Sequence, residues 1–430
     1  MRLFPVVLFL LFLVPLLGAC AGKTTTVRFN GSPYVDPATM QRDEIVYLPT
    51  GTRLTRDEFF RLLDCNRIVY VGEGHDNIYD HQVELEVIKE LCRRYPGRVV
   101  VGFEMLAAAH QEEIDRWSAG QLGEDDFVRI FAKDWGIRSY PYYREIFAFL
   151  KQERIPVRAL NVSRREKAAF MLRLGAGGHG AEKRPDTEKM KGSPEGSQKD
   201  SMETLPQIPD VPADPYQEKA LKAMFAGHAA GHGRIDMFLK VHQLWEETMA
   251  KNIVSYLESA AGKERIMVVL TGEFHVARGY GLPRRVFQRL KEPYRIVLTT
   301  TPPGLFESKP KTMHVDFPEL PLYLGDFLWC VPYRNLDDKL VRLGVGIEPA
   351  EPGPGLEIVM VEPGSPAAKA GLKKGDRLLS LAGKELKTPV GLSLLLFNYK
   401  PGDRVGMTVE RGETRLQLEA VLEAPDKSDK

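Results

Sequence analysis

The sequence predicts an α/β domain with a mainly parallel sheet and helices on both faces, followed by a small β-rich domain. Between residues 67 and 299, short apolar runs alternate with amphipathic helical stretches. The apolar runs lack polar alternation, which is typical of parallel strands that are covered on both faces. From Val341 onward the expected strands become short and are separated by Gly and Pro turns, which indicates a second domain.

The elements of the first domain follow from periodicity, taken in chain order. Strands are expected over 67–72, 98–103, 155–160, 265–270 and 294–299, and helices over 81–93, 143–151 and 237–259. Asp76 or Asn77 is expected to cap the first of these helices. Between residues 175 and 215, Gly, Pro and charged residues predominate, so this segment is expected to be a disordered insertion.

The N-terminus has the pattern of an export signal. One positive charge, Arg2, precedes an apolar run over residues 3–17, which is shorter than the roughly 20 residues of a membrane span. The following Leu17-Gly18-Ala19-Cys20 resembles the bacterial lipobox. We therefore expect a signal peptide over 1–19, a lipid on Cys20 and a tether over 20–43. Ala21, which follows Cys20, favours the outer membrane and an extracytoplasmic location; a plain signal peptide is the alternative.

Composition and cysteine count narrow the function classes. The formal net charge of +1 gives no general attraction to nucleic acid or to anionic lipid. Three cysteines remain after Cys20, namely Cys65, Cys92 and Cys330, and an odd number is a poor disulfide framework. Free thiols are therefore expected, with a Cys65–Cys92 pair as the alternative. The absence of Cys-x-x-Cys-His excludes covalent c-type haem, and the absence of Gly-x-Ser-x-Gly argues against a serine hydrolase.

Two turns of the same form end two of the expected strands. They are Gly72-Glu73-Gly74-His75 and Gly272-Glu273-Phe274-His275, and Glu104 ends a further strand. The carboxyl ends of parallel strands meet at one edge of a sheet, where ligand sites form. Glu73, His75, Glu104, Glu273 and His275 would then make a mixed N/O set for a divalent metal, or for hydrogen bonds to propionates. Taken singly, each is equally typical of an ordinary strand end.

These residues carry a family resemblance. The stretch from Gly72 to Gln82 resembles the opening motif of the ChaN-like haem-binding uptake proteins of the Tiki superfamily. The similarity continues through residues 103–105, 159–162, 243–250, 272–276 and 281–285, and assigns a ChaN-like domain to 44–330. The family usually has Asp at the position of Glu246. The resemblance implies an α/β fold, an extracytoplasmic lipoprotein and, in its best-known branch, a homodimer that holds stacked haems.

The resemblance also implies the haem ligands. In that branch a tyrosine binds the iron, and histidine and lysine of the partner subunit hold the propionates. Tyrosinate favours Fe(III) and suits carriage of haem. Tyr142 and Tyr143 are the candidate ligands, with ordinary packing on a helix that starts after Pro141 as the alternative, and Tyr79 and Tyr280 are the runners-up. From its place after His75, His81 is expected to face the same cleft, with a position on the helix surface as the alternative. Arg285 is expected to bind an anionic group, with a solvated basic face beside Arg284 and Arg289 as the alternative.

Residues 338–423 are expected to form the second domain, and 341–422 resemble a bacterial PDZ domain of HtrA-like envelope proteases. The carboxylate-binding loop and its strand are expected at Leu343-Gly344-Val345-Gly346-Ile347, and the groove helix at 390–399. In such domains, backbone N–H groups of the loop bind a terminal carboxylate while the strand pairs with the ligand backbone. The resemblance implies a protein C-terminus or a peptide as the partner.

Three functions remain open from sequence. The first is a haem-binding lipoprotein that handles haem or iron, with the PDZ domain docking it to a partner. The second is a metal-dependent hydrolase like the peptidases of the Tiki superfamily, with Glu73 or Glu104 as general base, a metal-activated water and substrate recruited by the PDZ domain. The third is a scaffold in which the cleft has only a structural role.

Overall fold

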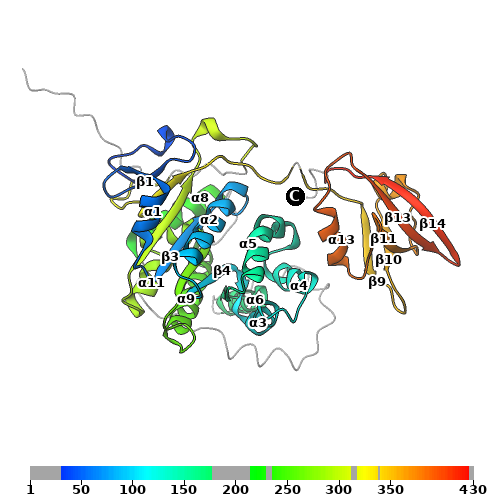
Figure 1. Cartoon of the computed structure of the whole chain (residues 1–430), viewed down its shortest axis with the longest axis horizontal. Coiled ribbons are helices and arrows are strands. Elements are labelled where there is room, and N and C mark those ends of the chain that lie inside the picture. The colour runs from blue at the N-terminus through cyan, green and yellow to red at the C-terminus, as the bar shows by residue number, and fades with distance from the viewer. Residues whose placement is uncertain (1–30, 177–213, 229–234, 311–316, 338, 426–430) are drawn as a thin grey trace, which may run out of the picture.

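The computed structural model describes residues 31–176, 214–228, 235–310, 317–337 and 339–425 (Figure 1). The expected signal peptide, Cys20 and nearly all of the expected insertion lie outside these residues. The N-terminal domain contains an eight-stranded sheet in the order β2-β1-β8-β7-β3-β6-β4-β5. Its strands are β1 (Ile45–Tyr47), β2 (Thr52–Leu54), β3 (Ile68–Glu73), β4 (Val99–Ala107), β5 (Val157–Asn161), β6 (Ile266–Gly272), β7 (Tyr294–Thr300) and β8 (Phe327–Cys330).

The sheet is parallel from β8 to β5, which confirms the expected α/β class. At one edge β1 and β2 run antiparallel, and neither these two strands nor β8 were predicted from the sequence. The central strands are completely buried over their length because helices cover both faces. The order places β3 beside β6, so the two Gly-x-x-His turns leave the sheet at neighbouring positions.

Alternate side chains of each strand enter two separate cores. On one face, Val69 and Val71 belong to a core that also contains residues of α1 to α5, and on the other face Tyr70 belongs to a core with residues of α9 and α11. The helices are α1 (Arg56–Leu63), α2 (Ile78–Arg94), α3 (Gln111–Ser118), α4 (Glu124–Asp134), α5 (Tyr140–Gln152), α6 (Arg164–Ala176), α8 (Pro215–His228), α9 (Ile235–Glu258), α10 (Glu273–Val276) and α11 (Leu282–Arg289). Asn77 caps α2 by accepting from the backbone N–H of Tyr79.

The first described residues already belong to the folded domain. Val35 and Met40 are buried in the core that contains α9 and α11. The backbone N–H of Asp43 donates to the carbonyl of Cys330 at 2.8 Å. The domain therefore begins before residue 44, where the sequence predicted its start. Val35 and Met40 are isolated apolar residues among polar ones, so the sequence pattern did not indicate that they are buried.

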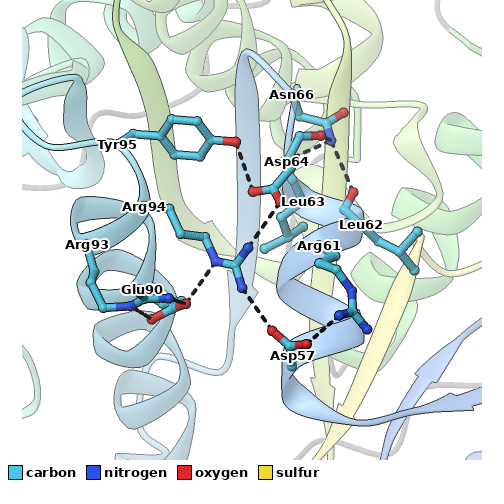
Figure 2. Close-up of polar contacts among 10 residues, drawn as sticks. All are labelled: Asp57, Arg61, Leu62, Leu63, Asp64, Asn66, Glu90, Arg93, Arg94 and Tyr95. Atoms are coloured by element: carbon cyan, nitrogen blue, oxygen red, sulfur yellow. Dashed lines mark hydrogen bonds and ion pairs between the residues drawn. The ribbon is translucent and has the colours of Figure 1, made fainter.

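A polar network joins the ends of α1 and α2 far from the Gly-x-x-His turns (Figure 2). Arg94 donates to Glu90 at 2.8 Å and to Asp64 at 3.1 Å, and the Tyr95 hydroxyl donates to Asp64 at 2.9 Å. Asp57 accepts a further contact from Arg94 at 3.3 Å. Because α2 begins at the turn that carries His75, this network fixes the opposite end of the helix that follows the site.

The C-terminal domain has its own antiparallel sheet and its own core. The sheet order is β14-β13-β11-β10-β9, with β12 paired to β11. Its elements are β9 (Val345–Pro349), β10 (Leu356–Val361), α12 (Pro366–Lys369), β11 (Arg377–Leu381), β12 (Lys384–Glu385), α13 (Pro389–Leu396), β13 (Arg404–Arg411) and β14 (Thr414–Val421). The helix α13 lies on the side that faces α4 and α5 (Figure 1).

The segment between the two domains is hydrogen-bonded to the turn after β3. The backbone N–H of Ile78 donates to the carbonyl of Arg334 at 2.9 Å, and Asn77 Nδ2 donates to the carbonyl of Pro332 at 3.0 Å. The Tyr333 hydroxyl donates to Asp76 at 2.8 Å. Residues 332–334 are therefore ordered against the turn that carries His75.

Cys65, Cys92 and Cys330 are free thiols, as the odd cysteine count indicated, although Cys65 is exposed rather than buried. Within the ranges given above, no helix combines the length and the apolar content that crossing a bilayer requires.

Candidate functional site

The two Gly-x-x-His turns converge because β3 and β6 pair in parallel register, with Glu73 opposite Gly272. Both glycines are needed for close packing. A Cβ on Gly72 would lie 2.5 Å from Leu298 Cδ2, and a Cβ on Gly272 would lie 2.8 Å from His75 Nε2. The glycines of the repeated motif thus leave room at the sheet edge for neighbouring side chains, and at Gly272 this room is occupied by the imidazole of His75.

His75 is the more accessible of the two motif histidines. Its Nδ1 lies 2.8 Å from Glu73 Oε1, and its side chain is 40% exposed. The Trp135 ring packs edge-on against the imidazole, with 5.0 Å between ring centroids. Burial opposes the charged imidazole, but the Glu73 carboxylate outweighs it and raises the pKa of His75. The Nε2 side of the ring lies over Gly272, which lines the same cavity as His75.

Glu73 lies at the centre of a buried network behind His75. The Tyr143 hydroxyl donates to Glu73 Oε1 at 2.7 Å, and His81 Nδ1 lies 2.8 Å from both Glu73 Oε2 and Glu84 Oε2. Burial alone would raise the pKa of Glu73, but the charges of His81 and His75 hold it far below its usual range. Burial, with the neighbouring Glu73, raises the pKa of Glu84 to about 8. The network orients His75 rather than contacting a ligand.

Glu104 and His275 form the second half of the site. Glu104 Oε2 accepts from the Thr271 hydroxyl and from the Gly272 N–H, at 2.5 and 2.8 Å. Glu104 Oε1 lies 3.4 Å from His275 Nε2. Burial opposes ionisation, yet the nearby imidazoles lower the pKa of Glu104 to about 2. Burial disfavours charge on His275 too, but Glu104 and Glu246 raise its pKa to about 10.

His242 on α9 is a site residue that was not predicted from the sequence. Its ring centroid lies 4.7 Å from that of His275, and its buried Nδ1 lies 3.7 Å from Glu246 Oε1 and accepts or donates no hydrogen bond among the described residues. Burial lowers the pKa of His242, so its imidazole is neutral and can donate a lone pair. His242, Glu246 and His275 present ligand atoms within 4.8 Å of one another. The i, i+4 spacing of His242 and Glu246 was the signal, but its partner His275 is distant in sequence.

A cavity of about 340 Å³ opens over these residues, within the size range of small-molecule sites. His75, Glu104, His242 and His275 line its polar floor. Its walls are mainly apolar, and two cations stand at its rim. The wall and rim residues include Met105, Trp135, Met224, Phe238, Trp245, Phe274, Arg164 and Lys167.

The other expected site residues do not line this cavity. Tyr143 is completely buried, and the Tyr142 hydroxyl accepts from the backbone N–H of Leu336 at 2.8 Å. The Tyr79 hydroxyl donates to Glu307, and Tyr280 is buried beside α8 and Leu320.

Three charged residues expected in the cleft are also set back from it. His81 is buried behind His75, and Arg285 is paired with Glu246 at 3.0 Å and with Glu247. Glu273 is half-buried in the second turn, where burial raises its pKa. The expected cleft thus divides into residues that line it, His75, Glu104 and His275, and residues that support it.

The donor set of the cavity is chemically suited to iron or to a divalent metal. Imidazole nitrogen and carboxylate oxygen are ligands for zinc, and imidazole is a common axial ligand of haem iron. The Nδ1 of His242, which has no hydrogen bond within the described part of the chain, and the close approach of His75 to Gly272 support this assignment. Apolar walls with rim cations would match a flat apolar cofactor that carries carboxylates.

A second cavity, of about 320 Å³, lies in the C-terminal domain at the expected peptide groove. Leu343, Gly344, Val345 and Ile347 line one side of it, and α13 lines the other. Gly344 has a φ of 78°, a left-handed conformation that favours glycine and shapes the loop at the groove entrance. Gly346 is the one residue of the expected loop that does not line the cavity; it packs against Met360.

Comparisons with known proteins match both domains. Residues 59–286 match the family described as haem-binding uptake, Tiki superfamily, ChaN, and residues 341–422 match the PDZ domain family. The solved structure of ChaN of Campylobacter jejuni with cofacial haem is 13% identical, with a TM-score of 0.47, over 69% of this chain and 100% of that chain.

Curated relatives match over shorter stretches. A predicted zinc metalloprotease of Brucella suis is 36% identical over 72 residues, 17% of this chain and 19% of the relative. The serine protease Do-like HtrA of Lactobacillus helveticus is 33% identical over 69 residues, 16% of this chain and 17% of the relative. The chain therefore spans less than a fifth of the length of either relative.

Proposed function

Because the chain belongs to the ChaN family of haem-binding uptake proteins in the Tiki superfamily, we propose that it binds haem in the cavity over His75. The observation that carries this proposal is the pairing of a partly exposed imidazole with a buried carboxylate, Glu73, under walls of Trp, Phe and Met. An imidazole whose other nitrogen is held by a carboxylate is a stronger and better-oriented metal ligand.

The cavity residues have separate roles in this proposal. His75 would hold the haem iron, and Arg164 and Lys167 at the rim would pair with the propionates. Lys167 Nζ lies 5.3 Å from the centroid of the Trp245 ring, so a positive charge is adjacent to an aromatic side chain of the cavity wall. When bound, haem supplies a Lewis-acidic iron that accepts the imidazole nitrogen. In this proposal His75 takes the place of the tyrosine ligand implied by the family resemblance, since the hydroxyls of Tyr142 and Tyr143 form hydrogen bonds outside the cavity.

The proposal includes an extracytoplasmic location. The lipobox-like segment ending at Cys20 supports a lipoprotein held at a membrane, in keeping with uptake of haem from outside the cytoplasm. The PDZ domain supports docking to a partner protein through a C-terminus or peptide. A homodimer, as implied by the best-known branch of the family, remains part of the prediction.

The protein lacking residues 1–20 tests this function by titration with ferric haem. We expect a saturable shift of the Soret band that is lost in His75→Ala and retained in Tyr79→Phe, whose hydroxyl contacts Glu307 outside the cavity. A Soret shift that is unchanged in His75→Ala would refute the proposal.

A second candidate function, a metal-dependent hydrolase, is favoured by one specific observation. His242, Glu246 and His275 present ligand atoms within 4.8 Å of one another, and two imidazoles with one carboxylate are a ligand set of catalytic zinc. A bound divalent ion would supply a water of lowered pKa. Of the two candidate bases, Glu104 lines the cavity, whereas Glu73 is buried behind His75.

Metal analysis separates the two functions. The hydrolase requires stoichiometric Zn, Mn or Co in the purified protein, together with peptide cleavage that is abolished in Glu104→Gln. Metal-free protein that binds haem and cleaves no peptide would exclude it.

A further inference from the structure

The peptide groove of the PDZ domain has a wall that belongs to the other domain. Arg138, on the 3₁₀ turn η3 (Ile137–Ser139) between α4 and α5, lines the groove cavity together with Val345, Leu392 and Leu396. Arg138 is exposed, and it makes no ion pair with any residue that the structure describes. The cation of the groove that belongs to the PDZ domain, Arg342, is instead paired with Glu362 at 3.0 Å.

The two domains are held together at the groove helix. Leu394 of α13 is buried in the large core of the α/β domain, where Val390 and Phe397 also pack. The Thr388 hydroxyl donates to Asp125 Oδ2 at 2.9 Å, and Arg144 donates to Asn398 at 3.3 Å. One face of α13 therefore contacts α4 and α5, while Leu392 and Leu396 on its other side line the groove. Arg138 is thus kept beside the groove by contacts at both ends of α13.

We propose that the groove binds an acidic C-terminal segment of a partner protein, and that Arg138 of the ChaN-like domain reads its acidic side chain. The apolar lining from Val345, Ile347 and Leu392 suits an apolar side chain, and the unpaired guanidinium suits a carboxylate. This inference rests on the proposed docking role of the PDZ domain and adds the charge of the partner. Peptide binding would contact both domains at once.

The 3₁₀ turn that carries Arg138 also lies next to the cavity over His75. Gly136, with a φ of 93°, turns the chain between Trp135, which packs on His75, and Arg138. A peptide that immobilises Arg138 would therefore restrain the segment that forms one wall of the cavity.

Selection of peptides tests the inference on the whole chain without residues 1–20. A library of random heptapeptides with free C-termini is selected against wild type, Arg138→Glu and Arg116→Glu, a control at an exposed arginine of α3 away from the groove. We expect wild type and Arg116→Glu to enrich an apolar last residue with Asp or Glu upstream, and Arg138→Glu to enrich Lys or Arg at the upstream position. The best acidic peptide, labelled with fluorescein, should bind Arg138→Ala about three- to tenfold more weakly than wild type.

A double-mutant cycle tests whether the effect depends on domain contact. A Cβ on Gly391 would lie 3.0 Å from Asp125 Oδ2, so Gly391→Glu places a like charge in the interface. In that background Arg138→Ala should no longer weaken binding of the acidic peptide. Identical enrichment by wild type and Arg138→Glu would overturn the role of Arg138 while leaving peptide docking intact. Enrichment of no peptide by any variant would overturn docking and the inference together.

Discussion

His75 Nδ1 lies 2.8 Å from Oε1 of Glu73, a carboxylate whose side chain has no exposed surface. The two residues belong to one strand-end turn, so the backbone of β3 fixes both the ligand and the group that orients it. Glu73→Gln keeps the shape of the pair but removes the negative charge. We expect this change to lower haem affinity about 10- to 100-fold, the usual effect of losing such a partner, as measured by Soret titration. Equal affinities for wild type and Glu73→Gln would argue that His75 is not the iron ligand.

Tyr143 distinguishes a supporting role from a ligating one. Its hydroxyl donates to Glu73 at 2.7 Å inside the core, so Tyr143→Phe leaves a buried carboxylate with one hydrogen bond fewer. We expect the free energy of unfolding to fall by about 1–3 kcal/mol in urea titrations, with the position of the Soret band unchanged. Loss of the Soret shift in a folded Tyr143→Phe protein would restore tyrosine as the iron ligand.

The rim cations should separate haem from metal binding. Arg164 and Lys167 carry the positive charge at the mouth of the cavity, and a bare divalent ion has no carboxylates for them to bind. We expect Lys167→Ala and Arg164→Ala each to weaken haem binding about three- to tenfold, and Lys251→Ala, at an exposed position of α9, to leave it unchanged. Metal content should not respond to any of the three, and a parallel loss of metal would indicate general damage to the cavity.

Asp80 should make the stability of the turn depend on pH. Burial raises the pKa of this carboxyl from 3.8 to about 7, although the Gly74 N–H donates to it at 2.7 Å. Because the folded state binds the proton more tightly than the unfolded state, its stabilising contribution is complete below about pH 4 and disappears as pH rises through about 7. Wild type should therefore lose about 2–4 kcal/mol relative to Asp80→Asn between about pH 4 and pH 8. Urea unfolding of both proteins across this pH range measures the difference, and parallel stability curves would refute it.

Leu394 and Leu392 lie two residues apart on α13 and enter different cores. Leu394 packs with the α/β domain, whereas Leu392 packs inside the PDZ domain. We expect Leu394→Ala to uncouple the two domains, so that one calorimetric transition becomes two, at a cost of about 2–4 kcal/mol. Leu392→Ala should lower the stability of the PDZ domain, while the contact between α13 and α4 should remain. Unchanged calorimetric cooperativity in Leu394→Ala would show that the interface does not couple unfolding.

The sequence was most informative where a motif coincided with a strand end. The glycine of each Gly-x-x-His turn, the apolar strand before it and the parallel sheet together predict that His75, Glu104 and His275 meet at one edge. The parallel pairing of β3 and β4 with β6 brings these three residues to that edge. The cap at Asn77 followed from an equally local rule, whereas the loop before β9 followed from the resemblance to PDZ domains.

The direction of side chains on helices was not predictable in the same way. The helix α5 begins at Tyr140 rather than near Tyr143, and Tyr143 lies on its buried face together with Tyr140 and Phe147. His242 escaped notice because its neighbour His275 comes from another element, so nothing within one helical stretch marked it. The antiparallel edge strands β1 and β2 are only three residues each, too short for a periodic signal.

The hydrogen bonds between residues 332–334 and the turn at 76–78 also determine how the protein bears mechanical load. If a docked partner pulls on the PDZ domain while the other end of the chain is held, tension passes along this segment before it reaches β8. Once the contacts of α13 with α4 and α5 are broken, the bonds at Asn77 and Asp76 would be stretched next, ahead of the sheet. Traction by a docked partner would therefore reach the turn at His75 before it reaches the strands of the sheet.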